Sequence, residues 1–159
     1  MTAGASARDG GELDGFHLGH LLPGIGELVS DFATEWEDVS FATRVWERPV
    51  GDGYRVDLRV HVLRGERLAD LGELRDFLAE YHERDAAAGD LADFAHPDGP
   101  RLIGATEALW LAAPGVAVDV LVDPEAADAV ALRSIAQGVR GPGAEVGTAR
   151  GPVWPVPPR

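Results

Sequence analysis

Five histidines and a few clustered acids are the residues of this chain best suited to chemistry. His17 and His20 are three residues apart, so a strand would place them on opposite faces, and no third ligand follows at a metal-binding spacing. Glu35 lies close to Glu37 and Asp38, but paired acids need contrasting environments to act as acid and base. We interpret these acids as part of a solvated segment, and we predict no metal site.

Other catalytic signatures are also missing from the sequence. Ser30, Ser40 and Ser134 lack the flanking glycines of a nucleophile elbow, and the chain contains no cysteine. Gly24 and Gly26 are not followed by the lysine of a phosphate-binding loop. The sequence therefore predicts no catalytic residues and no cofactor.

The clearest structural signal is the stretch Phe41–Arg64, which predicts a long β-hairpin. Residues 54–62 alternate strictly between apolar and polar side chains, as a strand with one buried face does. The dipeptide Asp52-Gly53 favours a two-residue turn between the strands. The hairpin would carry the apolar face toward the core and a charged face outward.

The position of the turn sets the register of the hairpin. A turn at Asp52-Gly53 places Arg48 opposite Asp57 and Trp46 opposite Arg59. A turn at Gly51-Asp52 would place Arg48 opposite Arg55, and like charges directly opposite each other are unfavourable. We therefore expect the Asp52-Gly53 register.

The remaining patterns predict an α+β domain with an antiparallel sheet of about five strands and two helices on one face. We expect a disordered segment at 1–14, a single domain at 15–140 and a Pro/Gly-rich tail at 141–159 that ends in VWPVPPR. The tail is either a polyproline-type recognition motif or a plain linker. The expected elements are a strand at 16–22, a strand or loop at 27–38, the hairpin 41–64, a helix at 70–81 capped by Asp70, a second hairpin formed by 102–112 and 116–122, and a helix from Asp123 through Val139.

The outer face of this sheet is the candidate binding surface. Tryptophans and arginines are enriched at interface hot spots, and a cluster of them is unusual in an acidic chain. The alternative is that these side chains pair with one another and have no partner. The predicted surface consists of Arg44, Trp46, Arg48, Arg55, Arg59, His61 and Trp110.

Two other functions remain open from the sequence. A carrier of a small apolar ligand would need a pocket between sheet and helices, lined by Phe41, Leu58, Val60, Leu74 and Leu109. A hydrolase would need the histidines to converge with Glu35 or Glu80, whereas His82 and its neighbours are most simply the exposed last turn of the first helix.

The charge of the chain limits its partners. The net charge is −13, whereas nucleic-acid binding needs a basic surface. No segment has the roughly 20 apolar residues of a membrane span, and no signal peptide is recognisable. We expect a cytoplasmic protein that binds a protein partner or forms a homodimer.

Three stretches resemble a known group of domains. The segments Leu22–Gly24, Trp110–Val122 and Leu132–Arg140 are similar to the small α+β sensor-type domains at the C-terminus of some anti-sigma factors and to relatives of the lipoprotein-carrier fold. The resemblance implies a non-catalytic domain that binds a partner or a lipid-like ligand on a curved antiparallel sheet.

Overall fold

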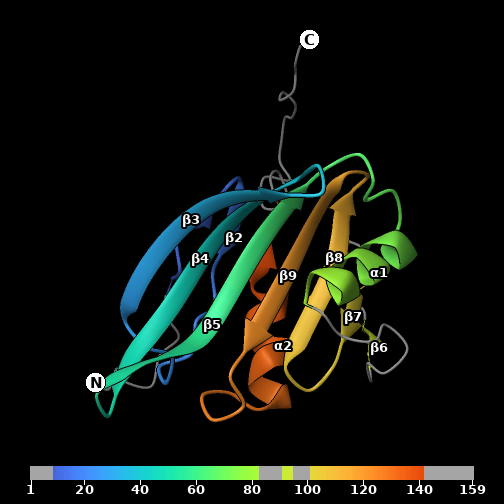
Figure 1. Cartoon of the computed structure of the whole chain (residues 1–159). Coiled ribbons are helices and arrows are strands. Elements are labelled where there is room, and N and C mark those ends of the chain that lie inside the picture. The colour runs from blue at the N-terminus through green and yellow to red at the C-terminus, as the bar shows by residue number, and fades with distance from the viewer. Residues whose placement is uncertain (1–8, 83–90, 95–100, 142–159) are drawn as a thin grey trace, which may run out of the picture.

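The computed structural model describes residues 9–82, 91–94 and 101–141, which form two antiparallel sheets and two helices (Figure 1). The large sheet has seven strands in the order β3-β4-β5-β9-β8-β7-β6, and the small sheet has the order β1-β2-β10. The α+β class is confirmed, but seven and three strands replace the predicted five. The strands are β1 (Glu12–Leu13), β2 (Phe16–Leu18), β3 (Leu28–Trp36), β4 (Val39–Val50), β5 (Gly53–Arg64), β6 (Ala92–Phe94), β7 (Arg101–Ile103), β8 (Glu107–Ala113), β9 (Val116–Val122) and β10 (Val139–Arg140).

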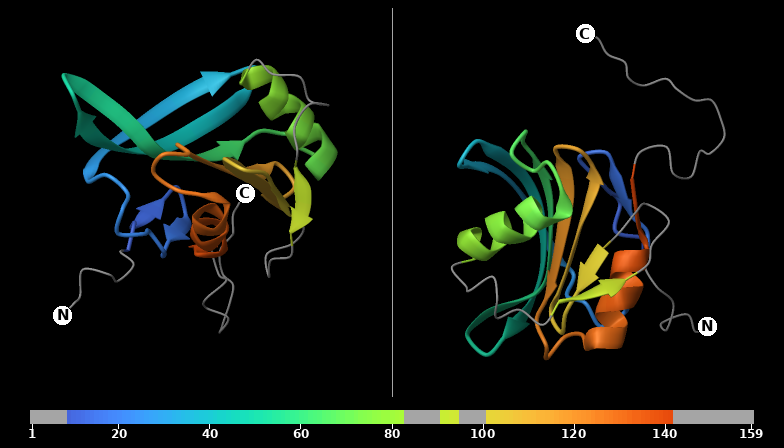
Figure 2. Two further views of the ribbon diagram at one scale, coloured as in Figure 1. Left: turned by 90° about the horizontal axis from the view of Figure 1, so that it is seen from below. Right: turned by 90° about the vertical axis from the view of Figure 1, so that its right-hand side faces the viewer.

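The two helices cover opposite faces of the large sheet (Figure 2). Helix α1 (Leu71–Tyr81) packs its buried Leu74 and Phe77 in the cluster that contains Phe41 of β4. Helix α2 (Ala129–Gln137) packs Leu132 and Ile135 against the other face, together with the small sheet. We call these the α1 face and the α2 face. The prediction that both helices lie on one face is wrong, because Leu63 of β5, Leu109 of β8 and Ala117 of β9 give the α1 face an apolar core of its own.

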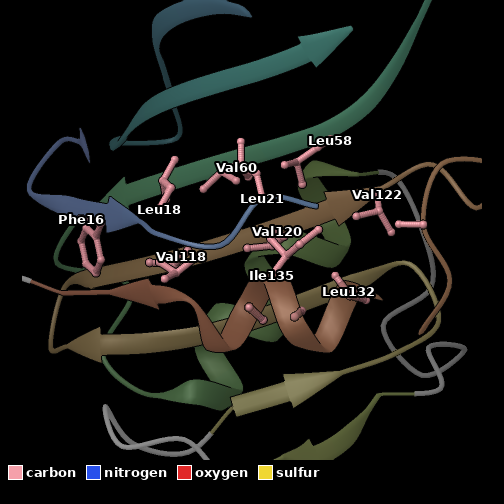
Figure 3. Packing of buried hydrophobic residues seen from close by; sticks show 14 of the residues in the cluster. Phe16, Leu18, Leu21, Leu58, Val60, Val118, Val120, Val122, Leu132 and Ile135 are labelled. Atoms are coloured by element: carbon pink, nitrogen blue, oxygen red, sulfur yellow. The ribbon is translucent and has the colours of Figure 1, made fainter. Parts of the chain in front are cut away.

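The core of the α2 face is the larger of the two (Figure 3). Ile135 of α2 lies beside Val120 of β9, while Phe16 and Leu18 of β2 cover the neighbouring part of the sheet. Leu18, Val120 and Ile135 are each at most 2% exposed. This packing explains how β2 can form although it has only three residues, too few to be stable alone.

Both helices begin at capping aspartates. Asp70 caps α1 as predicted, and its side chain accepts a hydrogen bond from the Glu73 backbone N–H. The second helix does not begin at Asp123, which instead closes a turn by accepting from the N–H of Glu125. Asp128 is the cap of α2, and Val139 lies in β10 rather than in the helix.

The hairpin β4–β5 is confirmed, but its predicted register is wrong. Val50 pairs with Gly53, so the turn residues are Gly51 and Asp52, and Gly51 has the positive φ of 58° that such a turn requires. Arg48 does lie opposite Arg55. The repulsion is removed because both guanidinium groups donate to the carboxylate of Asp57, each at 2.8 Å.

Asp57 is also the extra residue of a β-bulge. Trp46 pairs with Leu58 while Glu47 pairs with Val56, which leaves Asp57 without a partner on β4. Its side chain is fully buried and accepts a third hydrogen bond from the Gly26 N–H at 2.8 Å. Burial raises the pKa of the Asp57 carboxyl, but the hydrogen bonds from Arg48, Arg55 and Gly26 outweigh it and lower the pKa below its usual value.

The segments outside the sheet differ in part from expectation. Residues 9–14, predicted to be disordered, include β1, and Leu13 is 6% exposed. Of the predicted tail at 141–159, residues 142–159 with VWPVPPR lie outside the described residues. Within the described parts of the chain, neither helix has the length and apolar character needed to cross a bilayer.

Replacing Asp57 by alanine should lower the free energy of unfolding by about 3 kcal/mol or more, because it leaves two arginines and the Gly26 N–H without their buried acceptor. Urea unfolding followed by circular dichroism measures the loss. Asp31→Ala is the matched control, since the Asp31 carboxylate is 55% exposed although it also pairs with an arginine, and should cost less than about 1 kcal/mol. Equal losses in both variants would contradict this role for Asp57.

Candidate functional site

The predicted tryptophan and arginine surface does not exist as one exposed face. Trp46 is 2% exposed and Trp110 is 0% exposed, and both belong to the core of the α2 face. His61, at 4% exposed, lies on the other face together with Arg59. The prediction failed because it took alternating residues to lie on one buried and one exposed face of the sheet. In the structure, alternating residues lie on two faces that are both covered.

Three of the four arginines predicted on that surface beside Trp46 and Trp110 are engaged within the chain. Arg44 forms a two-pronged pair with Asp31, at 2.7 and 2.9 Å, and its third nitrogen donates to the Gly10 carbonyl. Arg48 pairs with Asp57 and also donates to the Gly24 carbonyl.

Arg55 pairs with Asp57 and with Glu125. Arg59 is exposed and makes no ion pair with the described residues. These arginines therefore stabilise the hairpin, and Arg59 alone of the four remains available on the surface.

The predicted apolar pocket is also divided. Phe41, Leu74 and Leu109 are buried on the α1 face, whereas Leu58 and Val60 are buried on the α2 face. All five are at most 2% exposed. A single ligand cavity lined by these five residues is therefore impossible in this fold.

A buried polar cluster lies on the α1 face where the C-terminus of α1 meets the sheet. His82 Nε2 is 3.1 Å from Asp119 Oδ2 of β9 and 3.7 Å from Glu107 Oε2 of β8. The side chains of His82, Glu107 and Asp119 are 14%, 5% and 0% exposed. We call these three residues with His61 the polar cluster.

His61 extends the polar cluster across the sheet. It pairs directly with Asp119 across β5 and β9 and with Thr43 across β4 and β5. His61 Nδ1 is 2.7 Å from Thr43 Oγ1, while Nε2 is buried and has no hydrogen-bond partner among the described residues. Burial, followed by the nearby charges of Arg59 and His82, lowers the pKa of His61 to about 3.

Aromatic rings hold α1 against this part of the sheet. Phe41 stacks on Tyr81 with centroids 4.5 Å apart, and it meets His61 edge to face at 5.6 Å. Trp36 of β3 contacts both Phe77 and Tyr81 at 5.3 Å. Because such contacts favour definite ring orientations, they position the two histidines, whose centroids are 6.4 Å apart.

The other candidate residues do not join the polar cluster. His17 lies on β2 and contacts Asp9 at 2.7 Å, and Glu35 and Glu80 are exposed. His96 lies outside the described residues. The convergence of histidines with Glu35 or Glu80 is therefore not observed for the described residues, and the prediction that His82 is exposed is wrong.

Glu107 and Asp119 are the members that sequence reasoning missed. Asp119 lies in the middle of a run of valines. An acid within an otherwise apolar strand is the sequence signal that could have indicated a buried polar group. The partners were not visible because the pairing of β5 with β9 joins segments far apart in the sequence.

Strand β3 forms a second distinctive surface. It is one of the two edge strands of the large sheet, it has nine residues, and almost all of its side chains are exposed. Leu28, Val29 and Phe32 are 45%, 53% and 53% exposed, which is high for large apolar residues. The segment 27–38, predicted as a strand or loop, is confirmed as a strand over 28–36.

The chain matches no protein-family model, no curated protein and no solved structure. The resemblance to sensor-type domains and lipoprotein carriers stays a prediction.

The buried, neutral His61 should make stability depend on pH. The unfolded chain binds a proton at this histidine near pH 6.5, whereas the folded protein does so only near pH 3. The contribution of His61 to the free energy of unfolding is therefore fully present above pH 6.5. Below that pH the free energy of unfolding falls by up to about 1.4 kcal/mol for each pH unit. Urea unfolding at pH 7.5, 6.5, 5.5 and 4.5 measures this slope.

A His61→Leu variant separates this effect from other groups, because it removes the titrating ring. It is expected to be less stable at pH 7.5 but to show a shallower slope between pH 6.5 and 4.5. His17→Gln, at a side chain that is 41% exposed, is the matched control and should retain the slope of the parent protein. An unchanged slope in His61→Leu would contradict the assignment.

Proposed function

We propose that the protein is a non-catalytic binding module whose contact surface is the edge strand β3, and that the partner is a second copy of the same chain. The observation that supports this proposal is the exposure of β3 on both faces while, among the described strands, its backbone pairs with β4 alone. An unpaired edge of this length is a template for another strand.

Strand β3 has charged side chains only at Asp31 and Glu35, and it lacks the proline and the β-bulge that also block edge-to-edge pairing. It contains no proline and no lysine, and it pairs with β4 from Leu28 to Trp36 without a register shift. Its charge at Asp31 is matched by Arg44 of the same chain. The edge is therefore regular, long and partly apolar, which favours addition of a strand.

The sequence of β3 also selects one register for pairing with its own copy. A two-fold axis perpendicular to the sheet keeps the faces of both copies aligned, and an axis at Phe32 pairs all nine residues. Leu28 then faces Trp36 of the second copy, and Phe32 faces Phe32. Axes at Asp31 or Ala33 would place acids opposite each other, which is unfavourable.

Two of the exposed apolar side chains of β3 lie on the α1 face, next to polar residues of β4. Phe32 lies opposite Thr43 and Leu28 opposite Glu47, so both side chains lie on the α1 face. In the proposed dimer, Phe32 of each copy would meet at the centre of a continuous sheet, where the cross-strand aromatic pair is stabilising.

Charges at position 32 test the proposal directly. Phe32→Glu and Phe32→Lys each place like charges across the axis and should weaken self-association by about tenfold or more, equivalent to about 1.4 kcal/mol. An equimolar mixture of the two variants places opposite charges across the axis and should restore the dimer. Sedimentation equilibrium over a concentration series measures each mass.

The matched control is Val130→Glu, which changes another exposed apolar residue, 74% exposed on α2. It should leave self-association unchanged. The proposal fails if the parent protein is monomeric at every concentration, if the mixture does not recover the dimer, or if Val130→Glu weakens association as strongly as Phe32→Glu does.

A further inference from the structure

We propose that His82, Glu107 and Asp119 form a binding site for a divalent transition-metal ion of the zinc type, with His61 beside the ion. This site is independent of the proposed self-association, because it lies under α1 and not at the edge of β3. The inference rests on the distances between ligand atoms, on their burial, and on the orientation of His61.

The spacing of the three ligand atoms suits one ion. They all lie within 4.8 Å of one another, and His82 Nε2 is 3.1 Å and 3.7 Å from the two carboxylate oxygens. Two ligands of a tetrahedral zinc ion, with bonds of about 2.0 to 2.2 Å, stand about 3.4 Å apart. The ion therefore fits with small side-chain adjustments.

The ligand types favour a transition metal over calcium or magnesium. The imidazole nitrogen of His82 is a ligand that suits zinc, copper, iron and nickel, and zinc also accepts carboxylate oxygens such as those of Glu107 and Asp119. Calcium needs six to eight oxygen ligands, and magnesium also prefers oxygen ligands, whereas this cluster offers two carboxylates and an imidazole nitrogen. The chemistry of the donors thus points to Zn²⁺ or an ion of similar size.

His61 is the independent observation that points to a ligand. It lies directly opposite Asp119 in the sheet, and its ring contacts that of His82. Its Nδ1 is held by Thr43 on the side of β4, and the two nitrogens of an imidazole ring point in nearly opposite directions, so Nε2 points away from β4. Nε2 is buried and has no hydrogen-bond partner among the described residues.

The Thr43 contact also prepares His61 for this role. If Nδ1–H donates to Thr43 Oγ1, Nε2 is the unprotonated nitrogen and can accept a hydrogen bond. A hydrogen bond made by one ring nitrogen in this way orients histidines in metal sites. The ring centroids of His61 and His82 are 6.4 Å apart, which is wide for two histidines on one tetrahedral ion. We therefore place His61 beside the open coordination position of the ion. A water bound at that position would donate a hydrogen bond to His61 Nε2.

The site would join three separate elements. His82 is the C-cap of α1, Glu107 begins β8 and Asp119 lies in the middle of β9. A bound ion would tie the end of α1 to the sheet, so binding and folding stability are linked. The chain should show a higher unfolding temperature with Zn²⁺ than with a chelator.

Metal binding to the full-length chain tests the proposal. Co²⁺ serves as the spectroscopic probe, since in a site of low coordination number it gives visible absorption bands that Zn²⁺ displaces. The parent protein should bind one Co²⁺ per chain, and Zn²⁺ should change the ring-nitrogen NMR signals of His82. No Co²⁺ bands and no shift of these signals would overturn the proposal without any variant.

Variants then assign the ligands. His82→Gln and Glu107→Gln should each lower Co²⁺ affinity by at least about 100-fold, whereas His61→Gln should lower it by about 10- to 100-fold, as loss of an outer contact does. Asp119→Asn is a further test if it folds. His17→Gln removes a histidine paired with Asp9 and should bind as the parent protein does.

Circular dichroism must show that each variant is folded at the temperature of the titration. Co²⁺ binding that persists unchanged in folded His82→Gln and Glu107→Gln, or that is lost in His17→Gln, would show that the ion binds elsewhere and would overturn the proposal.

Discussion

The buried carboxylate of Asp57 is the constraint on which the arrangement of the sheet depends. It binds two arginines and the Gly26 N–H, and it occupies the bulge that gives β5 one more residue than β4 across the stretch where they pair. Beyond the bulge, Trp46 lies on the same face as Leu58 and is buried under the small sheet, while Thr43 lies opposite His61. If Asp57 paired with a residue of β4, the side chains of β5 on one side of the bulge would point to the opposite face relative to those of β4.

The sequence predicted elements better than it predicted which side of them is exposed. Alternation in 54–62 identified β5, and Asp70 identified the start of α1, because these signals are local. Trp46 and Trp110 were expected on the outer face because a sheet with one covered face was assumed. The register was also wrong, since the repulsion between Arg48 and Arg55 was counted without the acid that lies between them.

The polar cluster shows why a group of buried polar residues cannot be recognised from the sequence when its members are not spaced as a known motif. His61, His82, Glu107 and Asp119 come from four elements, and no two of them form a recognisable motif. Asp119 alone was anomalous, as an acid within a run of valines. Its neighbour His61 becomes apparent only after β5 pairs with β9, and His82 only after the aromatic contacts of Tyr81 and Phe41 dock α1.

The strand order has a consequence for how the chain folds. On each side of the sheet the strands connect to near neighbours in the sequence, from β3 to β5 and from β6 to β9, while β5 and β9 join the two halves. Hairpins close quickly because their loops are short, whereas this central pairing must bring together distant segments. We expect two locally formed meanders to meet late along the row that contains His61 and Asp119, so the slowest step of folding would also assemble the polar cluster.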